Sequence, residues 1–219
     1  MKRALVTLLL CCCCATVSTD ARPLEPRNEA LESLMSSLQS AGECPADGHL
    51  MLDTVITAMS SAVLIEQIHA CKGKRIVIEV DSPGGSVYAA WQIQKAIERH
   101  DQPVACVVDG FAASAAFVTL QSCTTRYATD RAVLMAHAAS SGAEGQAEDL
   151  QNGAEVLRVI NWGMIERCSK RMGMSHAEFE SRVSGGLEWW FSQADALKFH
   201  AIDAPADSVA AVVLLAKEG

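Results

Sequence analysis

The sequence lacks any block of like charges, any low-complexity tract and any internal repeat, and its basic residues are in the minority. Its 18 lysines and arginines face 26 acidic residues, for a formal net charge of −8. An acidic chain without a basic cluster argues against nucleic acid as a partner. Half of the positions are apolar and only 20% are charged, a composition that excludes a disordered protein and predicts one main domain with a sizeable core.

The sequence also lacks an apolar run long enough to cross a bilayer. Lys2 and Arg3 precede an apolar run from Ala4 to Val17, which is shorter than the roughly 20 residues that a membrane-spanning helix needs. The charged start, the apolar run and the polar residues after it are typical of a secretory signal peptide. We therefore expect residues 1–21 to be a signal peptide and the mature protein to be periplasmic or secreted, with a retained membrane anchor as the alternative. No clean A-x-A site is present, so three cleavage points stay open, after Val17, Thr19 or Ala21.

Apart from the N-terminal run Cys11–Cys14, no two cysteines have C-x-x-C spacing. No group of His, Cys and carboxylate residues has the spacing of metal ligands either. We therefore expect neither a metal nor a cofactor. The run Cys11–Cys14 lies in the expected signal peptide, where it serves as apolar filler. An odd number of cysteines remains in an oxidising compartment, which predicts one or two disulfides without fixing their connectivity. These are Cys44, Cys71, Cys106, Cys123 and Cys168.

Apolar periodicity after the first residues predicts strands that alternate with helices. Strands are expected at 50–56, 75–80, 104–108 and 132–136, and helices at 28–40, 58–71, 86–99, 112–120 and 148–171. This alternation argues for one α/β domain, which we place at residues 49–219 after an N-terminal helix and linker at residues 22–48. The apolar run at 209–216 leaves two interpretations open, an edge strand or an oligomer contact.

Three segments carry the parts that acyl transfer needs, namely a nucleophile, a base and backbone N–H donors for an oxyanion. The turn at 81–85 (DSPGG) has glycines that let an N–H group face a substrate carbonyl. Ser114 lies in GFAASAA among small side chains at a strand-to-helix junction, and His137 ends the strand LMAH. Each segment also has an ordinary explanation: a tight turn, a helix-packing face and a core histidine. Their occurrence together and in this order favours the catalytic interpretation.

The order DSPGGSV, GFAASAA, LMAH resembles the proteolytic subunit of the Clp protease, a family of self-assembling serine peptidases. The resemblance continues through a handle-like segment at 142–150 and a closing segment at 191–203, and it covers roughly residues 76–203. It implies an α/β fold, the repeated β-β-α superhelix of the Clp/crotonase type. It also implies a homo-oligomer, because the handle helix of that family packs subunits together.

The resemblance implies a role for each candidate site residue. Ser114 corresponds to the nucleophile, His137 to the general base, and the N–H groups of Gly85 and Ala115 to the oxyanion hole. Glu188 stands where the family usually has the aspartate of the triad, and a glutamate can orient an imidazole although its reach differs. Three other acids are kept as fallbacks for the third position: Glu148, Asp149 and Asp195.

Two further positions depart from the family pattern. Ala138 and Ala139 replace the usual Gln-Pro after the histidine, and His200 replaces the glycine before the closing strand. Substrate alignment and subunit contacts near these positions stay open. The cytosolic family works with an ATPase ring, which an exported protein would not meet. The sequence therefore predicts cleavage of peptides or unfolded segments without ATP and without an ATPase partner.

Three competing functions belong to related folds. A signal-peptide-peptidase-like enzyme would pair the serine with a lysine, but none of the lysines after Ser114 lies in a motif that places it there. These are Lys170, Lys198 and Lys217. An inactive scaffold would keep the fold and assemble without catalysis. An acyl-CoA enzyme of the crotonase type would need CoA, which a secreted protein does not meet.

Overall fold

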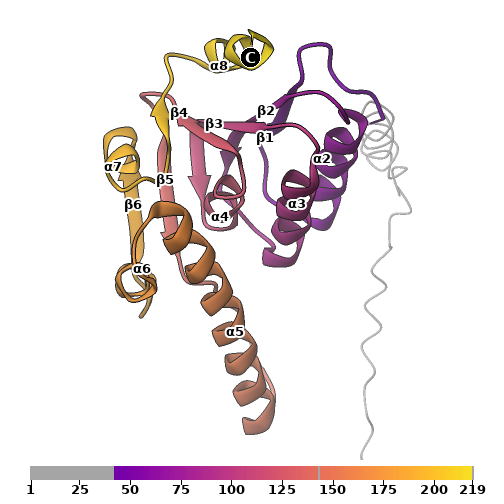
Figure 1. Ribbon diagram of the computed structural model, residues 1–219. Helices are drawn as coiled ribbons and strands as arrows, with labels where there is room; N and C mark the ends of the chain where they lie inside the picture. Colours follow the sequence, from indigo (N-terminus) through magenta and orange to yellow (C-terminus); the bar gives the residue numbers. More distant parts are fainter. Residues whose placement is uncertain (1–41, 143, 219) are drawn as a thin grey trace, which may run out of the picture. The chain divides into compact units, whose positions relative to one another are not determined.

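A computed structural model describes residues 42–142 and 144–218, and its centre is a mainly parallel β-sheet with helices on both faces (Figure 1). The expected signal peptide at residues 1–21 and the expected helix at 28–40 lie outside the described residues. Within the described part of the chain, no helix is both long and apolar enough to cross a membrane.

The sheet follows the order β1-β2-β3-β4-β7, and β5 pairs with β3 on one side and with β6 on the other. Every pairing is parallel except that of β5 with β6. Strands of this kind, connected by helices, are the α/β architecture that the sequence predicts. The strands are β1 (His49–Leu52), β2 (Ile76–Ser82), β3 (Val104–Ala113), β4 (Thr125–Ala128), β5 (Val133–His137), β6 (Glu188–Ser192) and β7 (Ala204–Pro205).

Helices follow most strands, and the predicted α/β fold class is confirmed. Their amphipathic faces supply much of the buried apolar cluster against the sheet. The helices are α2 (Ala58–Ala70), α3 (Val87–Arg99), α4 (Ala115–Leu120), α5 (Ala147–Met172), α6 (His176–Val183), α7 (Gln193–Lys198) and α8 (Val209–Glu218). The strand β4 and the helix α6 were not predicted, because both are short and carry a mixture of polar and apolar residues.

The C-terminal apolar run forms the helix α8, so its interpretation as an edge strand was wrong. Val212 and Val213 pack against Val77 of β2 and Val107 of β3. The apolar residues at positions 209, 212, 213 and 216 have helical spacing, and this spacing overrides the strand preference of valine. The helix thereby covers a face of the sheet.

The strand β3 is longer than predicted and carries the chain to the candidate nucleophile. We expected a turn at Asp109 and Gly110, but the chain there forms a bulge, where the register between β2 and β3 shifts. Gly110 has a φ of +141°, and a Cβ at this position would overlap the carboxylate of Asp81. That carboxylate accepts the N–H of Phe111 at 2.8 Å. Beyond the bulge the strand continues to Ala113 and pairs with β5.

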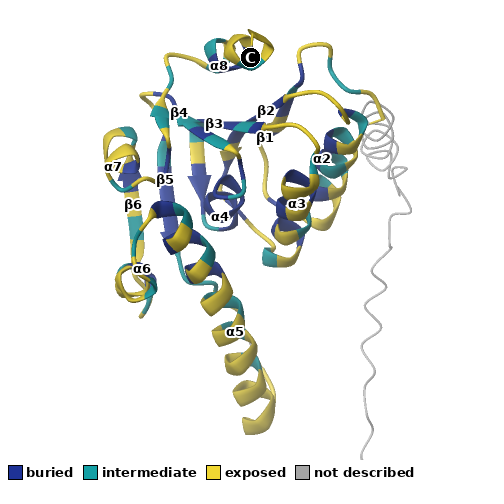
Figure 2. Cartoon of the chain, in the orientation of Figure 1, coloured by how far each residue is buried: buried dark blue, intermediate teal, exposed yellow. Residues whose placement is uncertain are grey.

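The helix α5 spans the predicted residues, but only its C-terminal half has the predicted buried face. Met164, Ile165 and Cys168 are buried, whereas Leu157 is half-buried and Leu150 is 44% exposed. Figure 2 shows the N-terminal half of α5 extending away from the sheet with an exposed surface. Helical periodicity continues along the whole helix, although the rest of the described chain covers only its C-terminal half.

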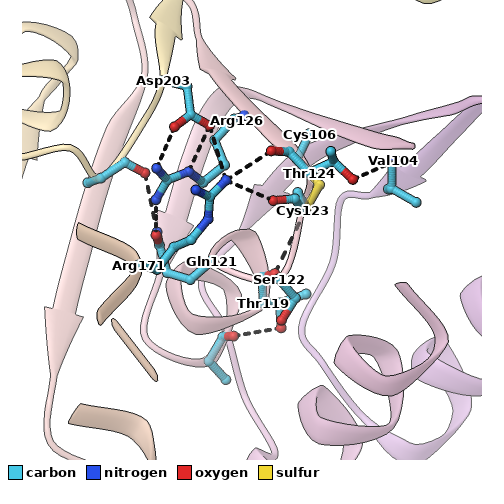
Figure 3. Close-up of a disulfide and its surroundings, with 12 residues drawn as sticks. Val104, Cys106, Thr119, Gln121, Ser122, Cys123, Thr124, Arg126, Arg171 and Asp203 are labelled. Carbon is cyan, nitrogen blue, oxygen red and sulfur yellow. Dashed lines mark hydrogen bonds and ion pairs between the residues drawn. A yellow bond between two sulfur atoms is a disulfide. The ribbon is translucent and has the colours of Figure 1, made fainter. Parts of the chain in front are cut away.

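Two disulfides link the cysteines that the sequence left unpaired. Cys44 pairs with Cys71, and Cys106 of β3 pairs with Cys123 after α4 (Figure 3). The fifth cysteine, Cys168, is buried and free, and burial raises the pKa of its thiol to about 12. A thiol with so high a pKa is unreactive, which makes Cys168 a packing residue.

A buried arginine lies beside the second disulfide, in a cluster that the sequence did not reveal (Figure 3). Arg126 is 1% exposed and donates to the carboxylate of Asp203 through Nε at 3.0 Å, Nη2 at 2.6 Å and its backbone N–H at 2.8 Å. Its Nη1 donates to Gln121, and Arg171 donates to Asp203 at 3.3 Å. Burial alone would raise the pKa of Asp203, but the hydrogen bonds and charges of the two arginines outweigh it, so this pKa lies below its usual value.

Candidate active site

Ser114 occupies a strained position between β3 and α4. Its φ of +56° and ψ of −121° lie in a region that non-glycine residues rarely adopt. The backbone N–H of Ser114 donates to the carbonyl of Met135 on β5 at 2.8 Å, which fixes the residue against the neighbouring strand. The flanking residues Ala113 and Ala115 are buried alanines, so little bulk surrounds the hydroxyl. This sharp strand-to-helix turn places the half-buried Ser114 directly after the end of β3.

His137 ends the neighbouring strand and meets the serine. Ala113 is in register with Met135 in the parallel pairing of β3 and β5, so Ser114 and His137 follow at the same edge of the sheet. The Nε2 atom of His137 lies 2.6 Å from the Oγ atom of Ser114. With the imidazole proton on Nδ1, Nε2 accepts the hydrogen of the serine hydroxyl. The structure thus brings together the two residues that the sequence placed 23 positions apart.

The DSPGG segment packs directly against this serine. Ser82 is buried, donates its hydroxyl to the carbonyl of Thr54 at 2.6 Å and accepts the N–H of Gly84 at 3.1 Å. Gly84 has a φ of +91°, and a Cβ there would lie 2.8 Å from the Cβ of Ser114. Only glycine therefore allows the two segments to approach so closely.

The two predicted oxyanion donors border one cavity. Gly85, with a φ of +145°, has no room for a Cβ because that atom would overlap the carbonyl oxygen of Ile56. Gly85 and Ala115 both line the cavity beside Ser114 and His137. Two backbone N–H groups that face the carbonyl oxygen of a bound substrate stabilise a tetrahedral oxyanion, and Gly85 and Ala115 border the cavity in which that oxygen would lie.

Glu188 lies opposite His137, but in the described part of the chain no hydrogen bond joins the two side chains. The two residues are cross-strand partners in the antiparallel pairing of β5 and β6. Directly opposed residues have Cβ atoms about 5 Å apart. The carboxylate of Glu188 is exposed and accepts the indole N–H of Trp190 at 3.1 Å.

The three fallback acids are placed elsewhere. Asp149 accepts the N–H of Gln146 at 3.1 Å and so caps α5, and Glu148 is an exposed residue of the first turn of that helix. Asp195 accepts the hydroxyl of Ser192 at 2.7 Å. Of the four acids, Glu188 is the one in register with the histidine.

The segment after the histidine is held by a residue that sequence analysis missed. Asn161 of α5 accepts the N–H of Ala139 through Oδ1 at 2.6 Å and donates Nδ2 to the carbonyl of the same residue at 3.3 Å. The N–H of Ala138 donates to the carbonyl of Val183 at 3.3 Å. An asparagine in the middle of a helix was the available signal, because this residue type is unfavourable there unless its side chain has a partner.

His200 occupies the other departure from the family pattern. It has a φ of +56°, in the left-handed region that glycine adopts at low cost. The turn that the sequence resemblance implies is therefore kept, although the side chain differs.

A cavity of about 160 Å³ opens beside the serine and the histidine, between α3, α4 and α5. Its walls are mainly apolar, from Val87, Ala90, Trp91, Val118, Ile160 and Met164. Among residues 42–142 and 144–218, no group of three His, Cys, Asp or Glu side chains is placed to hold a metal ion.

Comparison with known proteins agrees with this arrangement. A family model described as Clp protease matches residues 35–208. The ATP-dependent Clp protease proteolytic subunit of Porphyromonas gingivalis is 30% identical over 163 residues, which are 72% of each chain. Proteolytic subunit 1 of Chlamydia muridarum is 31% identical over 157 residues, 68% of this chain and 80% of that one. Proteolytic subunit 1 of Chlamydia trachomatis is 32% identical over 136 residues, 60% of this chain and 69% of the relative.

Proposed function

This chain belongs to the Clp protease family of serine peptidases, and we propose that it is an exported endopeptidase that cleaves peptides or unfolded protein segments without ATP. The observation that carries the proposal is the 2.6 Å separation of Ser114 Oγ and His137 Nε2 at the mouth of a cavity. A serine activated by a histidine is the nucleophile of an acyl-enzyme mechanism.

The proposed reaction proceeds in two halves. His137 Nε2 takes the proton of Ser114 as Oγ attacks the scissile carbonyl, and the N–H groups of Gly85 and Ala115 stabilise the oxyanion. The C–N bond breaks as His137 gives its proton to the leaving amine. Water then attacks the acyl-serine with His137 again as base, which frees the acid product and the serine hydroxyl.

Glu188 is proposed as the acid of the triad. Its cross-strand position opposite His137 supports this role, because directly opposed residues of an antiparallel pair lie on the same face. The proposal requires that the carboxylate leave Trp190 and turn to Nδ1 of the histidine. A carboxylate there would hold the tautomer that leaves Nε2 free to accept the serine proton, and it would stabilise the imidazolium that forms.

The proposed export rests on the N-terminal pattern of residues 1–21 and on the disulfides. Disulfides persist in oxidising compartments and are rare in the cytosol. The pairs Cys44–Cys71 and Cys106–Cys123 therefore favour a periplasmic or secreted protein. A protease in such a compartment has neither ATP nor a cytosolic ATPase ring, so its substrates must already be extended.

A homo-oligomer is proposed on the exposed face of α5. Four large apolar side chains of this helix are more than two-fifths exposed: Leu150, Val156, Val159 and Trp162. A cluster of apolar side chains on a projecting helix marks a contact surface, and a second copy of the chain is the partner that the family resemblance implies.

The proposal is tested by cleavage of fluorogenic peptides and of permanently unfolded casein by the mature protein, without nucleotide. We expect turnover in the wild type and a loss of about 10⁴-fold or more in kcat for Ser114→Ala and for His137→Ala. Glu188→Gln should lower kcat by about 100-fold, whereas Asp195→Asn should not. Ser181→Ala on α6 and His69→Ala on α2, both at exposed positions, are matched controls. A folded, assembled wild type without turnover would instead support the inactive scaffold.

A further inference from the structure

The side chain of Gln94 is buried beside the candidate active site without a hydrogen-bond partner. Gln94 is 2% exposed, and among the described residues neither its Nε2 nor its Oε1 atom has a partner. It lines the same cavity as Ser114 and His137. Native proteins leave few buried polar groups unpaired, and each such group calls for an explanation. Both amide atoms are covered in this structure, so a substrate that supplies the missing partners reaches them by displacing the side chains that cover them.

We propose that Gln94 sets the specificity of the protease by binding a substrate side chain that ends in a carboxamide, glutamine above all. This inference rests on the proposed function, since the side chain in question belongs to the residue whose carbonyl Ser114 attacks. Gln94 has one amide donor group and one acceptor oxygen, and a second carboxamide is complementary to both. The substrate amide would donate to Oε1 of Gln94 and accept from Nε2.

The placement of Gln94 on α3 directs it to this cavity. Val87, Ala90, Trp91 and Gln94 all line the cavity and follow the spacing i, i+3, i+4, i+7, so they share one face of the helix. The first three provide an apolar wall for the methylene groups of a substrate side chain. Gln94 is the polar residue among these four, and it and Ala90 are the two most deeply buried of them.

The charge of the cavity excludes ionised side chains. Among the described residues that line it, His137 is the titratable one, and no Asp, Glu, Lys or Arg contributes. A buried lysine or glutamate side chain of a substrate would therefore have no counter-charge, which strongly disfavours its binding. A neutral amide meets no such penalty.

The size of the cavity suits a side chain of this length. Its volume of about 160 Å³ is roughly ten times what a single water molecule requires. A methionine or leucine side chain also fits the apolar walls, but it leaves both amide atoms of Gln94 unpaired. The two additional hydrogen bonds of a carboxamide give an expected preference of roughly tenfold.

The test uses peptides that differ only at the cleaved residue, which is glutamine, methionine, leucine or glutamate. We expect the wild type to cleave after glutamine with a kcat/KM about tenfold above methionine and far above glutamate. Gln94→Met, which keeps the length of the side chain, should lose or reverse the preference for glutamine over methionine. Gln92→Met is the matched control, because Gln92 lies on the same helix but does not line the cavity. Equal preferences in wild type and Gln94→Met would overturn the inference.

Two further measurements separate possible failures. Labelling of Ser114 by a small fluorophosphonate requires no substrate side chain. Labelling without a preference for glutamine would refute this inference alone, whereas no labelling would refute the proposed function. The melting temperature of Gln94→Met should equal or exceed that of the wild type, because an unpaired buried amide is replaced by an apolar side chain. A clear decrease would show that Gln94 has a structural partner and would also overturn the inference.

Discussion

Arg126 and Gln94 are both buried polar side chains, but they lie in two regions that differ in hydrogen bonding. Arg126 is paired with Asp203 and Gln121 in a cluster beside a disulfide. Gln94 has no partner among the described residues, although it is just as deeply buried. Complete pairing stabilises a fold, whereas an unpaired group in a cavity is available to a ligand. We therefore assign the first region to stability and propose the second for substrate recognition.

The largest effect is expected from breaking the paired region. Asp203→Ala leaves Arg126 buried without its counter-charge, and we expect the free energy of unfolding to fall by about 3 kcal/mol. This value is at the lower end for a buried ion pair because Asp203 itself is partly exposed. Chemical denaturation measures this change. Asp207→Ala, at an exposed acid of the same segment, is the control and should change stability by less than about 0.5 kcal/mol. A loss equal to that of the control would mean that the cluster contributes little.

A smaller effect, on kcat, is expected where α5 contacts the segment after His137. Asn161→Leu removes both hydrogen bonds to Ala139, which follows the proposed general base His137 by two residues. We expect kcat to fall by about tenfold, because His137 is less well positioned. Asn161→Asp keeps the acceptor for the N–H of Ala139 and should restore most of kcat. A fall in melting temperature in both variants, with kcat unchanged, would show a purely structural role.

The smallest effect concerns acid pH and the pKa of Asp203. Burial raises this pKa, but the hydrogen bonds from Arg126 and the charges of Arg126 and Arg171 outweigh burial, so the net pKa lies below the usual value of about 3.9. An aspartate with a lowered pKa stabilises the fold above its unfolded pKa, and this contribution is lost as the pH falls through the folded pKa. The stability difference between wild type and Asp203→Asn should thus be constant above about pH 5 and shrink below about pH 4. A difference that stays constant to pH 2 would contradict the assignment.

The sequence predicted the parts of the fold and site that depend on local patterns. Strand and helix periodicity located β2, α3 and α5, and the resemblance to the Clp protease family joined Ser114 to His137. The contacts across the sheet were not predictable in this way. The bulge at Gly110 depends on the carboxylate of Asp81, which precedes its hydrogen-bond partner Phe111 by 30 residues. The pairing of Arg126 with Asp203 spans 77 residues.

Two errors have the same physical origin. The N-terminal half of α5 was expected to be buried because its apolar residues are periodic. Periodicity shows that a helix has an apolar face, but it does not show whether the same chain covers that face. For the run at 209–216 an edge strand and an oligomer contact both stayed open, and the run instead forms the helix α8, which packs against β2 and β3. In both segments the tertiary surroundings, which a single sequence does not show, determine the result.

The most direct measurement of the central claim is fluorophosphonate labelling of the mature protein, followed by mass spectrometry of the modified peptide. We predict stoichiometric modification of Ser114, no modification in Ser114→Ala, and labelling of His137→Ala slowed by orders of magnitude because the hydroxyl loses its base. Modification of a different residue, or none at all in a folded wild type, would contradict the assignment of Ser114 and His137 as nucleophile and base.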